Sequence, residues 1–536
     1  FYGGLNDLQG FFYCFFRKEY LCQKNVWGWI ERRCLPRRFS STRKPRGIFG
    51  DVAYIQLRGE PYQQQIQKDG VIIEIDTNQS LNVLANHTHY QDGLEEKIDV
   101  AKEHLSDLFE RDGYYTIQKK IEQGNSLTFD EAFGLGVFVC AALNKPLHDA
   151  LQMKLKNIMP LDTHLLQATT LLSAMSTKEA YIGLSAEEIA GMVAATIHLD
   201  TVARPAYRDP LIAFGGMGGD KGYPLNSHTT KLFSLSTMAA IALSVSNAVH
   251  KHHSYPNTSK VAGQSAIEAF GARSDFHTPE ALSEVLHQSN LLMTSCHNTR
   301  TLHSLSHKLK GETVNHVIGP LAFTVSAETP VHAMIGVNEK VHPSVVVDAL
   351  SILSEKGFQR YENSAVYCGT LVSADDDKML DPGFMKHIVV LDEIAPPPYK
   401  TIASFLVGGE NAGTYILSPE DFYDPRDLAD FSPASLAIPN TYEAIMEANN
   451  SAIEGKDITR AKYLAMTVGL GIFVRRCLTD PNALDRKKKR VNREMLRKCT
   501  RHGLEALLSG KGKEQLDRYV SVTNKFAGKG GEYEFI

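Results

Sequence analysis

The chain has 536 residues, of which 43% are hydrophobic and 22% are charged, and its formal net charge is −4. This length predicts two or three domains, because a single hydrophobic core rarely grows so large. The composition is ordinary for a soluble globular protein, and the slightly acidic balance argues against a nucleic acid as partner. The eight cysteines show no zinc-ligand spacing and are too few for a disulfide-based scaffold.

Residues 1–47 differ in composition from the rest of the chain. Aromatic residues are interspersed with arginine and lysine, and residues 37–46 are rich in arginine and serine and contain no acidic residue. This composition is typical of a mitochondrial transit segment, and we therefore expect a mitochondrial location. Two alternatives stay open: a basic arm without fixed structure, or an extension that anchors the chain to a partner protein or a membrane lipid surface.

Residues 48–110 are interpreted as an added N-terminal region, with a strand at residues 71–75 and a helix at residues 94–110. A helical domain is expected at residues 111–205. Within it, Thr128 with Glu131 and Ser185 with Glu188 have the spacing of capping boxes, in which a hydroxyl and a carboxylate each accept from a backbone N–H at a helix start.

Short apolar runs alternate with helical patterns from about residue 211 onward. The runs lie at residues 211–214, 333–337, 365–367 and 387–391. Such alternation is typical of a mostly parallel sheet with helices on its faces. The fold class predicted for residues 206–536 is therefore α/β.

A glycine-rich turn, Gly-Gly-Met-Gly-Gly-Asp at residues 215–220, directly follows the first apolar run. Glycine at the carboxyl end of a strand leaves backbone N–H groups open to a phosphate, because no Cβ blocks the approach. Many tight turns are glycine-rich, so this turn alone is a weak indication. The candidate phosphate-binding residues are Gly216, Gly218, Gly219 and Asp220.

Several further segments follow this turn in order, and their combination is more specific than any single one. Taken alone, an Asp-Glu pair after an apolar run is best interpreted as part of a solvated loop that follows a strand. The segments are residues 233–240 with Ser236 and Thr237, residues 249–254 with Lys251 and His252, residues 265–271, residues 313–321, and residues 391–396 with Asp392 and Glu393.

In this order the segments resemble those of the anthranilate phosphoribosyltransferases, relatives of the pyrimidine nucleoside phosphorylases, over residues 112 to about 525. The resemblance implies a small helical domain before a large α/β domain, and a homodimer formed through the helical domain. It also implies a phosphoribosyl pyrophosphate site and a Mg²⁺ site. The implied donor-binding residues are Gly216, Gly218, Gly219, Asp220, Ser236, Thr237, Lys251 and His252, and the implied metal residues are Asp392, Glu393 and Ser236.

The sequence departs from the family's pattern at several of these segments. Met217 replaces a threonine, Ser234 an asparagine, and His253-Ser254-Tyr255 a Gly-Asn-Arg sequence. Residues 221–231 are an insertion in the donor loop, residues 304–309 lack the arginine expected for the acceptor, and His316 stands at an asparagine position. The loss of one hydrogen-bond donor of this kind can lower a rate by about 10² to 10³, so the pattern indicates an eroded site.

Three functions follow from these observations. The favoured one is a structural or accessory subunit of a larger mitochondrial inner-membrane complex. The alternative is an active transferase that uses Mg²⁺ and phosphoribosyl pyrophosphate and acts on anthranilate, as in tryptophan biosynthesis, or on another acceptor. The third is a nucleic-acid-binding or lipid-binding relative, suggested by a basic run at residues 486–498 that we place on a helix, although a solvated helical face is the simpler interpretation.

Overall fold

The computed structural model describes residues 63–68, 71–76, 98–99 and most of 113–526. Within 113–526 it leaves out residues 143, 156–157, 201–204, 206, 208, 219–229, 254–260, 275, 277, 295–312, 324, 386–387 and 389. The extension at residues 1–47, the boundary at 110/111 and most of the helix expected at 94–110 lie outside the described residues. The strand expected at 71–75 is confirmed, because β2 (Val71–Asp76) pairs antiparallel with β1 (Gln63–Lys68).

The helical part begins with a set of helices that includes a long central one. Both predicted capping boxes are formed: Thr128 caps α8 with Glu131, and Ser185 caps α11 with Glu188. The elements are α7 (Gly113–Glu122), α8 (Phe129–Ala141), α9 (Lys145–Lys154), α10 (Leu161–Tyr181), α11 (Ala186–Ala195) and the π-helical turn η2 (Thr196–Asp200).

A mixed sheet of eight strands, counted over the described residues, forms the centre of the second part. The strands β8, β7, β3, β5 and β6 are parallel to one another, while β9 and β10 pair antiparallel with β8, and β11 pairs antiparallel with β10. In spatial order the main strands are β11 (Glu410–Leu417), β10 (Thr401–Val407), β8 (Tyr361–Thr370), β7 (Val331–Gly336), β3 (Leu211–Gly216), β5 (Val249–His252) and β6 (Leu291–Thr294), with β9 (Val390–Leu391) beside β8. The predicted α/β class with a mostly parallel sheet is confirmed.

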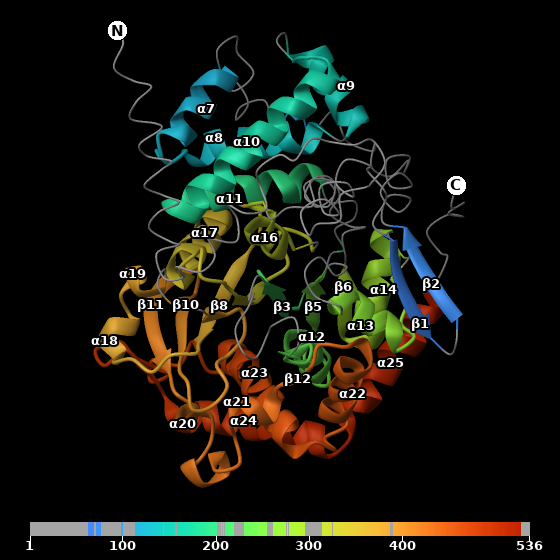
Figure 1. Ribbon diagram of the computed structural model, residues 1–536, viewed down its shortest axis with the longest axis vertical. Coiled ribbons are helices and arrows are strands. Elements are labelled where there is room, and N and C mark those ends of the chain that lie inside the picture. Colours follow the sequence, from blue (N-terminus) through green and yellow to red (C-terminus); the bar gives the residue numbers. More distant parts are fainter. Residues whose placement is uncertain are drawn as a thin grey trace, which may run out of the picture. The chain divides into compact units, whose positions relative to one another are not determined.

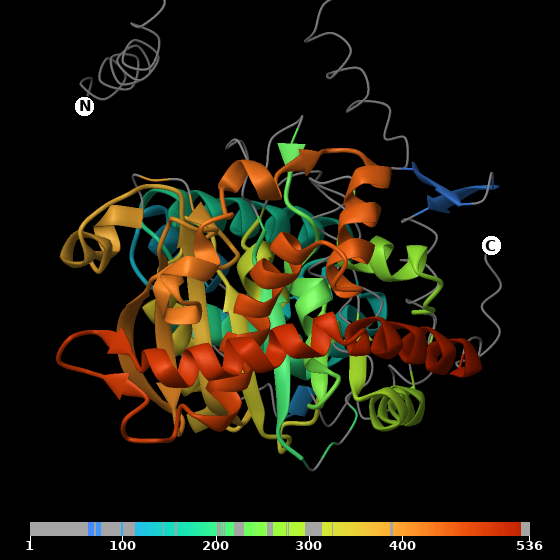
Figure 2. The same cartoon turned by 90° about the horizontal axis from the view of Figure 1, so that it is seen from below.

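Helices cover the sheet on its two sides. Helix α17 (Pro343–Glu355) packs against β8, β10 and β11 and also meets α11, whereas α23 (Ile458–Arg476) contacts β7 and β8. Figure 1 shows α7–α11 at one end, the sheet in the middle and the C-terminal helices at the other end, and Figure 2 views these last helices from below. The parallel strands are almost wholly buried, as expected when both faces of a sheet are covered.

Further helices complete this part. They are α12 (Leu235–Leu243), α13 (Gly263–Ala269), α14 (Pro279–Ser289), α16 (Asn315–Ile318), η3 (Gly319–Leu321), α18 (Asp376–Met379), α19 (Pro382–Met385), α20 (Pro419–Phe422), η4 (Pro425–Leu428), α21 (Pro433–Leu436), α22 (Tyr442–Ile453), α24 (Arg493–Leu508) and α25 (Lys511–Phe526). Two short pairs, β4 (Thr230–Lys231) with β12 (Ile438–Pro439) and β13 (Leu484–Asp485) with β14 (Arg490–Val491), lie outside the main sheet. None of the helices in the described part of the chain has the length and apolar character needed to cross a bilayer.

The last helix, α25, is bonded to segments that lie more than 200 positions earlier in the sequence. The Met293 N–H of β6 donates to the Tyr519 hydroxyl at 3.2 Å, and the Arg273 N–H donates to the Thr523 hydroxyl at 3.1 Å. The Gln515 side-chain amide also donates to the Ser289 carbonyl at the end of α14. The edge of the sheet at β6 is therefore held in place by the C-terminal helix.

The basic run at residues 486–498 is partly a hairpin and not a continuous helix, so that prediction was wrong. Residues 486–489 form the turn between β13 and β14, and only the residues from Arg493 onward belong to α24. Lys489 has a positive φ of 53°, which no helix accommodates.

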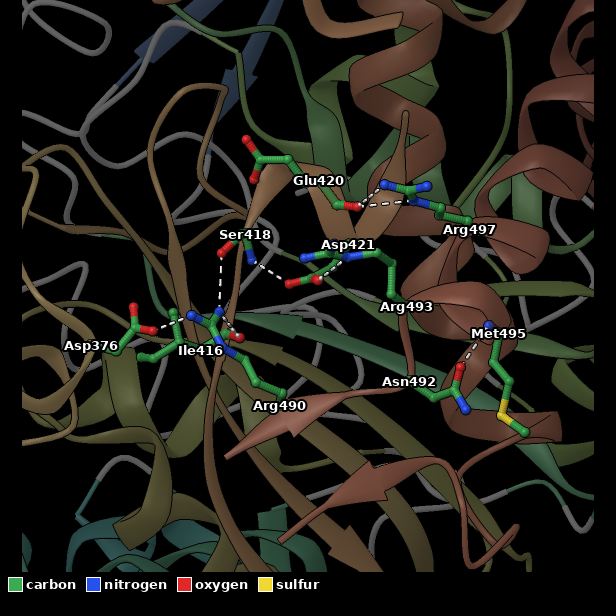
Figure 3. A network of polar contacts seen from close by, with 10 residues as sticks. All are labelled: Asp376, Ile416, Ser418, Glu420, Asp421, Arg490, Asn492, Arg493, Met495 and Arg497. Atoms are coloured by element: carbon green, nitrogen blue, oxygen red, sulfur yellow. Dashed lines mark hydrogen bonds and ion pairs between the residues drawn. The ribbon is translucent and has the colours of Figure 1, made fainter. Parts of the chain in front are cut away.

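Three arginines of this run are tied to the protein itself (Figure 3). Arg490 contacts the carboxylate of Asp376 and donates to the Ser418 hydroxyl at 3.1 Å. Arg493 pairs with Asp421 at 3.1 Å, and Arg497 donates to the Glu420 carbonyl at 2.8 Å. These arginines therefore join β14 and α24 to α18 and α20, and two of them, Arg490 and Arg493, pair with carboxylates of the protein itself.

A buried ion pair joins α10 to α11. The ammonium of Lys178 contacts a carboxylate oxygen of Glu188, and the two side chains are 1% and 0% exposed. The same carboxylate accepts from the backbone N–H of Leu127 at 3.0 Å and that of Ser185 at 2.8 Å. One capping residue thus links three segments, and its buried negative charge is balanced by a single lysine.

Replacing Lys178 by methionine should lower the free energy of unfolding by about 3 kcal/mol, because it leaves the Glu188 carboxylate buried without its cation. Urea unfolding followed by circular dichroism measures this change. Lys145→Met, which removes an exposed i,i+4 pair with Asp149 on α9, serves as the control and should leave the unfolding midpoint unchanged. Equal effects of the two variants would contradict the role assigned to the buried pair.

Candidate functional site

The glycine turn after β3 lies against two other chain segments. A Cβ on Gly215 would come within 2.4 Å of the Pro320 carbonyl oxygen, and one on Gly216 within 2.9 Å of Asp392 Oδ2. On the neighbouring strand β7, a Cβ on Gly336 would stand 1.7 Å from the Asp392 carbonyl oxygen. Glycine at these positions therefore lets the segment after β9 lie directly on the ends of β3 and β7.

Asp392 is hydrogen-bonded to the glycine turn. The Gly218 N–H donates to Asp392 Oδ2 at 2.7 Å, and Gly218 has a φ of 61°, a conformation that favours glycine. The side-chain amide of Asn338 donates to the Gly218 carbonyl at 3.1 Å. Hydrogen bonds from Gly218 to Asp392 and from Asn338 to Gly218 thus fix the turn. One backbone N–H of the turn, that of Gly218, already donates to a carboxylate of the protein itself.

Lys251, at the third position of β5, faces the same region. Its ammonium donates to the Ser236 hydroxyl at 3.2 Å, and the residue is 4% exposed. Burial lowers the pKa of Lys251 below its ordinary value, while Glu393 and Asp392 favour the charged form and act in the opposite direction. Burial raises the pKa of the Tyr367 phenol on β8, and the negative charges of Glu393 and Asp392 act in the same direction.

The predicted residues Gly216, Gly218, Asp392 and Lys251 are therefore brought to one end of the sheet, with Ser236 next to the lysine. The described residues contain no group of three or more His, Cys, Asp or Glu side chains placed to hold a metal ion. The two adjacent carboxylates fit a Mg²⁺ ion that takes its remaining ligands from phosphate oxygens and water, as this ion usually does. Gly219 and Asp220 lie outside the described residues.

His252 was predicted to bind the donor, yet in the structure it faces the neighbouring strand β6. Its Nδ1 lies 3.1 Å from the Thr294 hydroxyl, and Nε2 of His250 lies 2.9 Å from the same hydroxyl. Burial lowers the pKa of His252 to about 4, with the Lys251 charge acting in the same direction. Burial likewise lowers the pKa of His250, to about 3, and both rings pack between β5 and β6.

Ser234 and Thr237 lie at the start of α12, where one buried asparagine holds the backbone. The Ser234 N–H donates to Asn449 Oδ1 at 2.8 Å, and Asn449 Nδ2 donates back to the Ser234 hydroxyl at 3.2 Å. Asn449 belongs to α22 and is fully buried. Thr237 is also buried and lies beside Gly263, whose Cβ would come within 3.0 Å of its hydroxyl.

His316, at the start of the segment that ends in Gly-Pro-Leu, lies close to a carboxylate of the helical part. Its Nε2 lies 3.0 Å from Glu179 Oε1 of α10, and the two side chains are 11% and 1% exposed. The nearby Val314 N–H donates to the Ser176 hydroxyl of the same helix at 3.1 Å. Residues 304–309 lie outside the described residues, as does the insertion except for residues 230–231, which form β4.

Sequence reasoning missed several residues that shape this region. They are Thr294, Asn338, Tyr367, Asn449 and Glu179. Each lies far along the chain from the residue it contacts and in a segment without a recognisable motif, so the sequence carried no local signal for them.

The architecture is similar to that of solved anthranilate phosphoribosyltransferases. The enzyme from Thermus thermophilus is 20% identical with a TM-score of 0.51, and the alignment covers 76% of this chain and 99% of that one. The enzyme from Saccharomyces cerevisiae, solved in complex with phosphoribosyl pyrophosphate and Mg, is 15% identical with a TM-score of 0.53, over 78% of this chain and 99% of that one. The chain has the anthranilate phosphoribosyltransferase fold. No protein-family model and no curated protein sequence matches it.

The close contact at Gly336 gives the first prediction for the site. Gly336→Ala should lower the melting temperature by several degrees, because the added Cβ collides with a backbone carbonyl that cannot rotate away. Differential scanning calorimetry measures this change. Gly319→Ala is the control, since its Cβ would meet only the Asn315 side chain at 3.2 Å, and it should melt close to the wild type. A Gly336→Ala variant with the wild-type melting temperature would contradict the packing described.

The hydrogen bonds between Ser234 and Asn449 give the second prediction for the site. Asn449→Leu keeps the number and branching of the side-chain heavy atoms but leaves the Ser234 N–H without its acceptor, which should cost about 1–3 kcal/mol. Hydrogen exchange should then accelerate at the first turn of α12 and less elsewhere. Glu447→Ala, an exposed change on the same helix, should leave that turn protected. Unchanged exchange in the Asn449 variant would show that the bond does not hold α12.

Proposed function

We propose that this chain is a phosphoribosyltransferase-fold protein with an eroded donor site, and that it serves as an accessory subunit of a larger mitochondrial inner-membrane complex. The observation that supports this most directly is the placement of His253 directly after β5. A glycine at this position would leave room for a ligand beside Thr237, and the histidine fills that room.

His253 is packed into the structure. It is 7% exposed, and its backbone N–H donates to the Thr294 carbonyl at 2.9 Å. The Cβ of His253 lies close to Gly263, the first residue of α13. A Cβ added to Gly263 would come within 2.9 Å of the His253 Cβ and within 3.0 Å of the Thr237 hydroxyl. His253 and Thr237 therefore both lie against the start of α13, and displacement of the histidine by a diphosphate would disturb a close contact.

The glycine turn supports the same conclusion. Met217, in place of a threonine, is 4% exposed and adds an apolar side chain to the core instead of a hydroxyl. The Gly218 amide is already paired with Asp392. Binding a phosphate at this turn would thus require the exchange of an internal charge-assisted hydrogen bond for an external one.

Apolar residues on the helical part suit a protein partner. Of the eight large hydrophobic side chains that are exposed among the described residues, six lie between residues 115 and 182: Tyr115, Met153, Met159, Leu166, Tyr181 and Ile182. Exposed apolar side chains that form one contiguous surface are typical of interaction sites. We assign these residues to the contact with another subunit of the complex, and a second copy of this chain, the homodimer implied by the resemblance, is the other outcome of the test.

An active transferase is the second candidate, favoured by the cluster of Lys251, Ser236, Asp392 and Glu393. A buried ammonium next to two carboxylates could stabilise a departing pyrophosphate together with Mg²⁺, whose chemistry when bound is to neutralise the charge that develops on the leaving group. The yeast enzyme of the same fold is solved with phosphoribosyl pyrophosphate and Mg. Under this second candidate function, the chain would use the same donor and ion.

Calorimetric titration of phosphoribosyl pyrophosphate into the purified chain, with and without Mg²⁺, separates the two candidates. The accessory role predicts no binding at millimolar donor by a protein that melts cooperatively. Binding that requires Mg²⁺ and is lost in Asp392→Asn would overturn it and support the transferase. The asparagine keeps an oxygen for the Gly218 N–H, so a loss of binding would report the charge and not the fold.

The partner is identified by a second measurement. The tagged chain, purified from mitochondria in mild detergent, should migrate on native gels at the mass of a large assembly. Tyr181→Glu should release it if the apolar residues of the helical part form the contact. A free monomer or homodimer in the soluble mitochondrial fraction, or a location outside mitochondria, would contradict the accessory role.

A further inference from the structure

Two cysteines lie side by side where α23 meets α24, outside the candidate donor site. Cys477 follows the last turn of α23, Cys499 lies in α24, and their sulfur atoms are 3.7 Å apart. Cys477 is partly exposed, while Cys499 is 6% exposed. By contrast, Cys368 is buried and its sulfur lies against Met385.

The distance between the two sulfurs is set by close packing of the helices. A Cβ on Gly469 of α23 would come within 2.4 Å of the Thr500 hydroxyl, and one on Gly503 of α24 within 2.7 Å of Val468. Because no side chains separate the helices at these points, the helices cannot shift without losing contact. The sulfurs must approach by about a further 1.7 Å to reach a disulfide bond length of ~2.05 Å, which side-chain rotation can provide.

We propose that Cys477 and Cys499 form a reversible disulfide when the chain meets a small oxidising disulfide such as oxidised glutathione. The Cys477 thiolate attacks one sulfur of oxidised glutathione, and the second glutathione leaves as a thiolate that takes up a proton. The Cys499 thiolate then attacks Sγ of Cys477 and expels the first glutathione. Two protein thiols are oxidised, one oxidised glutathione is reduced to two thiols, and both protons end on glutathione.

The surroundings support this order of steps. Cys477 is the more accessible thiol, so it meets the oxidant first. Burial raises the pKa of Cys499 to about 12, and the neighbouring Cys477 adds to this shift, whereas Arg476 and Lys498 act in the opposite direction. Once Cys477 is bound to glutathione, its thiol no longer adds to the raised pKa of Cys499; burial still opposes ionisation, and Arg476 and Lys498 favour the thiolate.

The bond would close a covalent loop over residues 477–499 and so restrict the unfolded chain. For a loop of this length in a chain of this size, the melting temperature should rise by about 3–4 °C. The added link would fix the hairpin β13–β14, which lies within the loop, and the start of α24 with its arginines.

Peptide mapping of the full-length chain tests the proposal. The reduced protein is incubated with oxidised glutathione, alkylated under denaturing conditions and digested with trypsin, which cleaves after Arg476, Arg486, Lys498 and Arg501. We expect peptide 477–486 linked to peptide 499–501, and its loss after reduction. Recovery of the two peptides unlinked, from a protein that still melts cooperatively, would overturn the proposal.

Single variants test the order of the steps. Cys499→Ser should accumulate the mixed disulfide at Cys477, since no second thiol resolves it. Cys477→Ser should leave Cys499 without glutathione until the protein is unfolded. Cys368→Ser is the matched control and should form the linked peptide at the wild-type rate. A glutathione adduct on Cys499 in the folded Cys477→Ser protein would contradict the order, and equal oxidation of all described cysteines would contradict a preorganised pair.

Discussion

The close contact between the segment after β9 and the ends of three strands is the constraint on which the candidate site depends. Gly336 admits the Asp392 carbonyl, and Gly216 admits the Asp392 side chain. A Cβ on Gly369 of β8 would likewise lie 2.6 Å from the Ala395 nitrogen. From the other side, the Tyr463 hydroxyl of α23 donates to the Ile394 carbonyl at 2.6 Å. The close packing of the backbone around residues 392–395 therefore fixes where the carboxylates of Asp392 and Glu393 lie, and contact of these carboxylates with water does not.

This packing also explains the electrostatics around Lys251. A lysine with 4% exposure would ordinarily lose its charge, and the two carboxylates held by the glycines act against that loss. Asp392 accepts from the Gly218 N–H and Lys251 donates to the Ser236 hydroxyl, so internal hydrogen bonds help to hold the cluster in place.

Much of the fold could be predicted from local sequence patterns. The runs at 211–214, 333–337 and 365–367 became β3, β7 and β8, and both capping boxes were found, because apolar periodicity and hydroxyl–carboxylate spacing report on neighbours in the chain. Strand β5 gave no such signal, since its residues 249–252 include two histidines and a lysine that are buried by tertiary packing. Contacts such as that of Asn449 with Ser234 join segments 215 positions apart and are invisible to any local pattern. The prediction of a helix over residues 486–498 was wrong, because a high density of charged residues says nothing about the conformation of the backbone.

The bonds from α25 to the edge of the sheet bear on how the chain is completed during synthesis. Strand β6 and the end of α14 are bonded to Tyr519 and Gln515, each of which is synthesised 226 residues after its partner, Met293 or Ser289. Until then, the edge of the parallel sheet at β6 is exposed and can pair with other strands. A nascent chain that still lacks α25 therefore presents an uncovered strand edge, and truncation before residue 515 should favour aggregation.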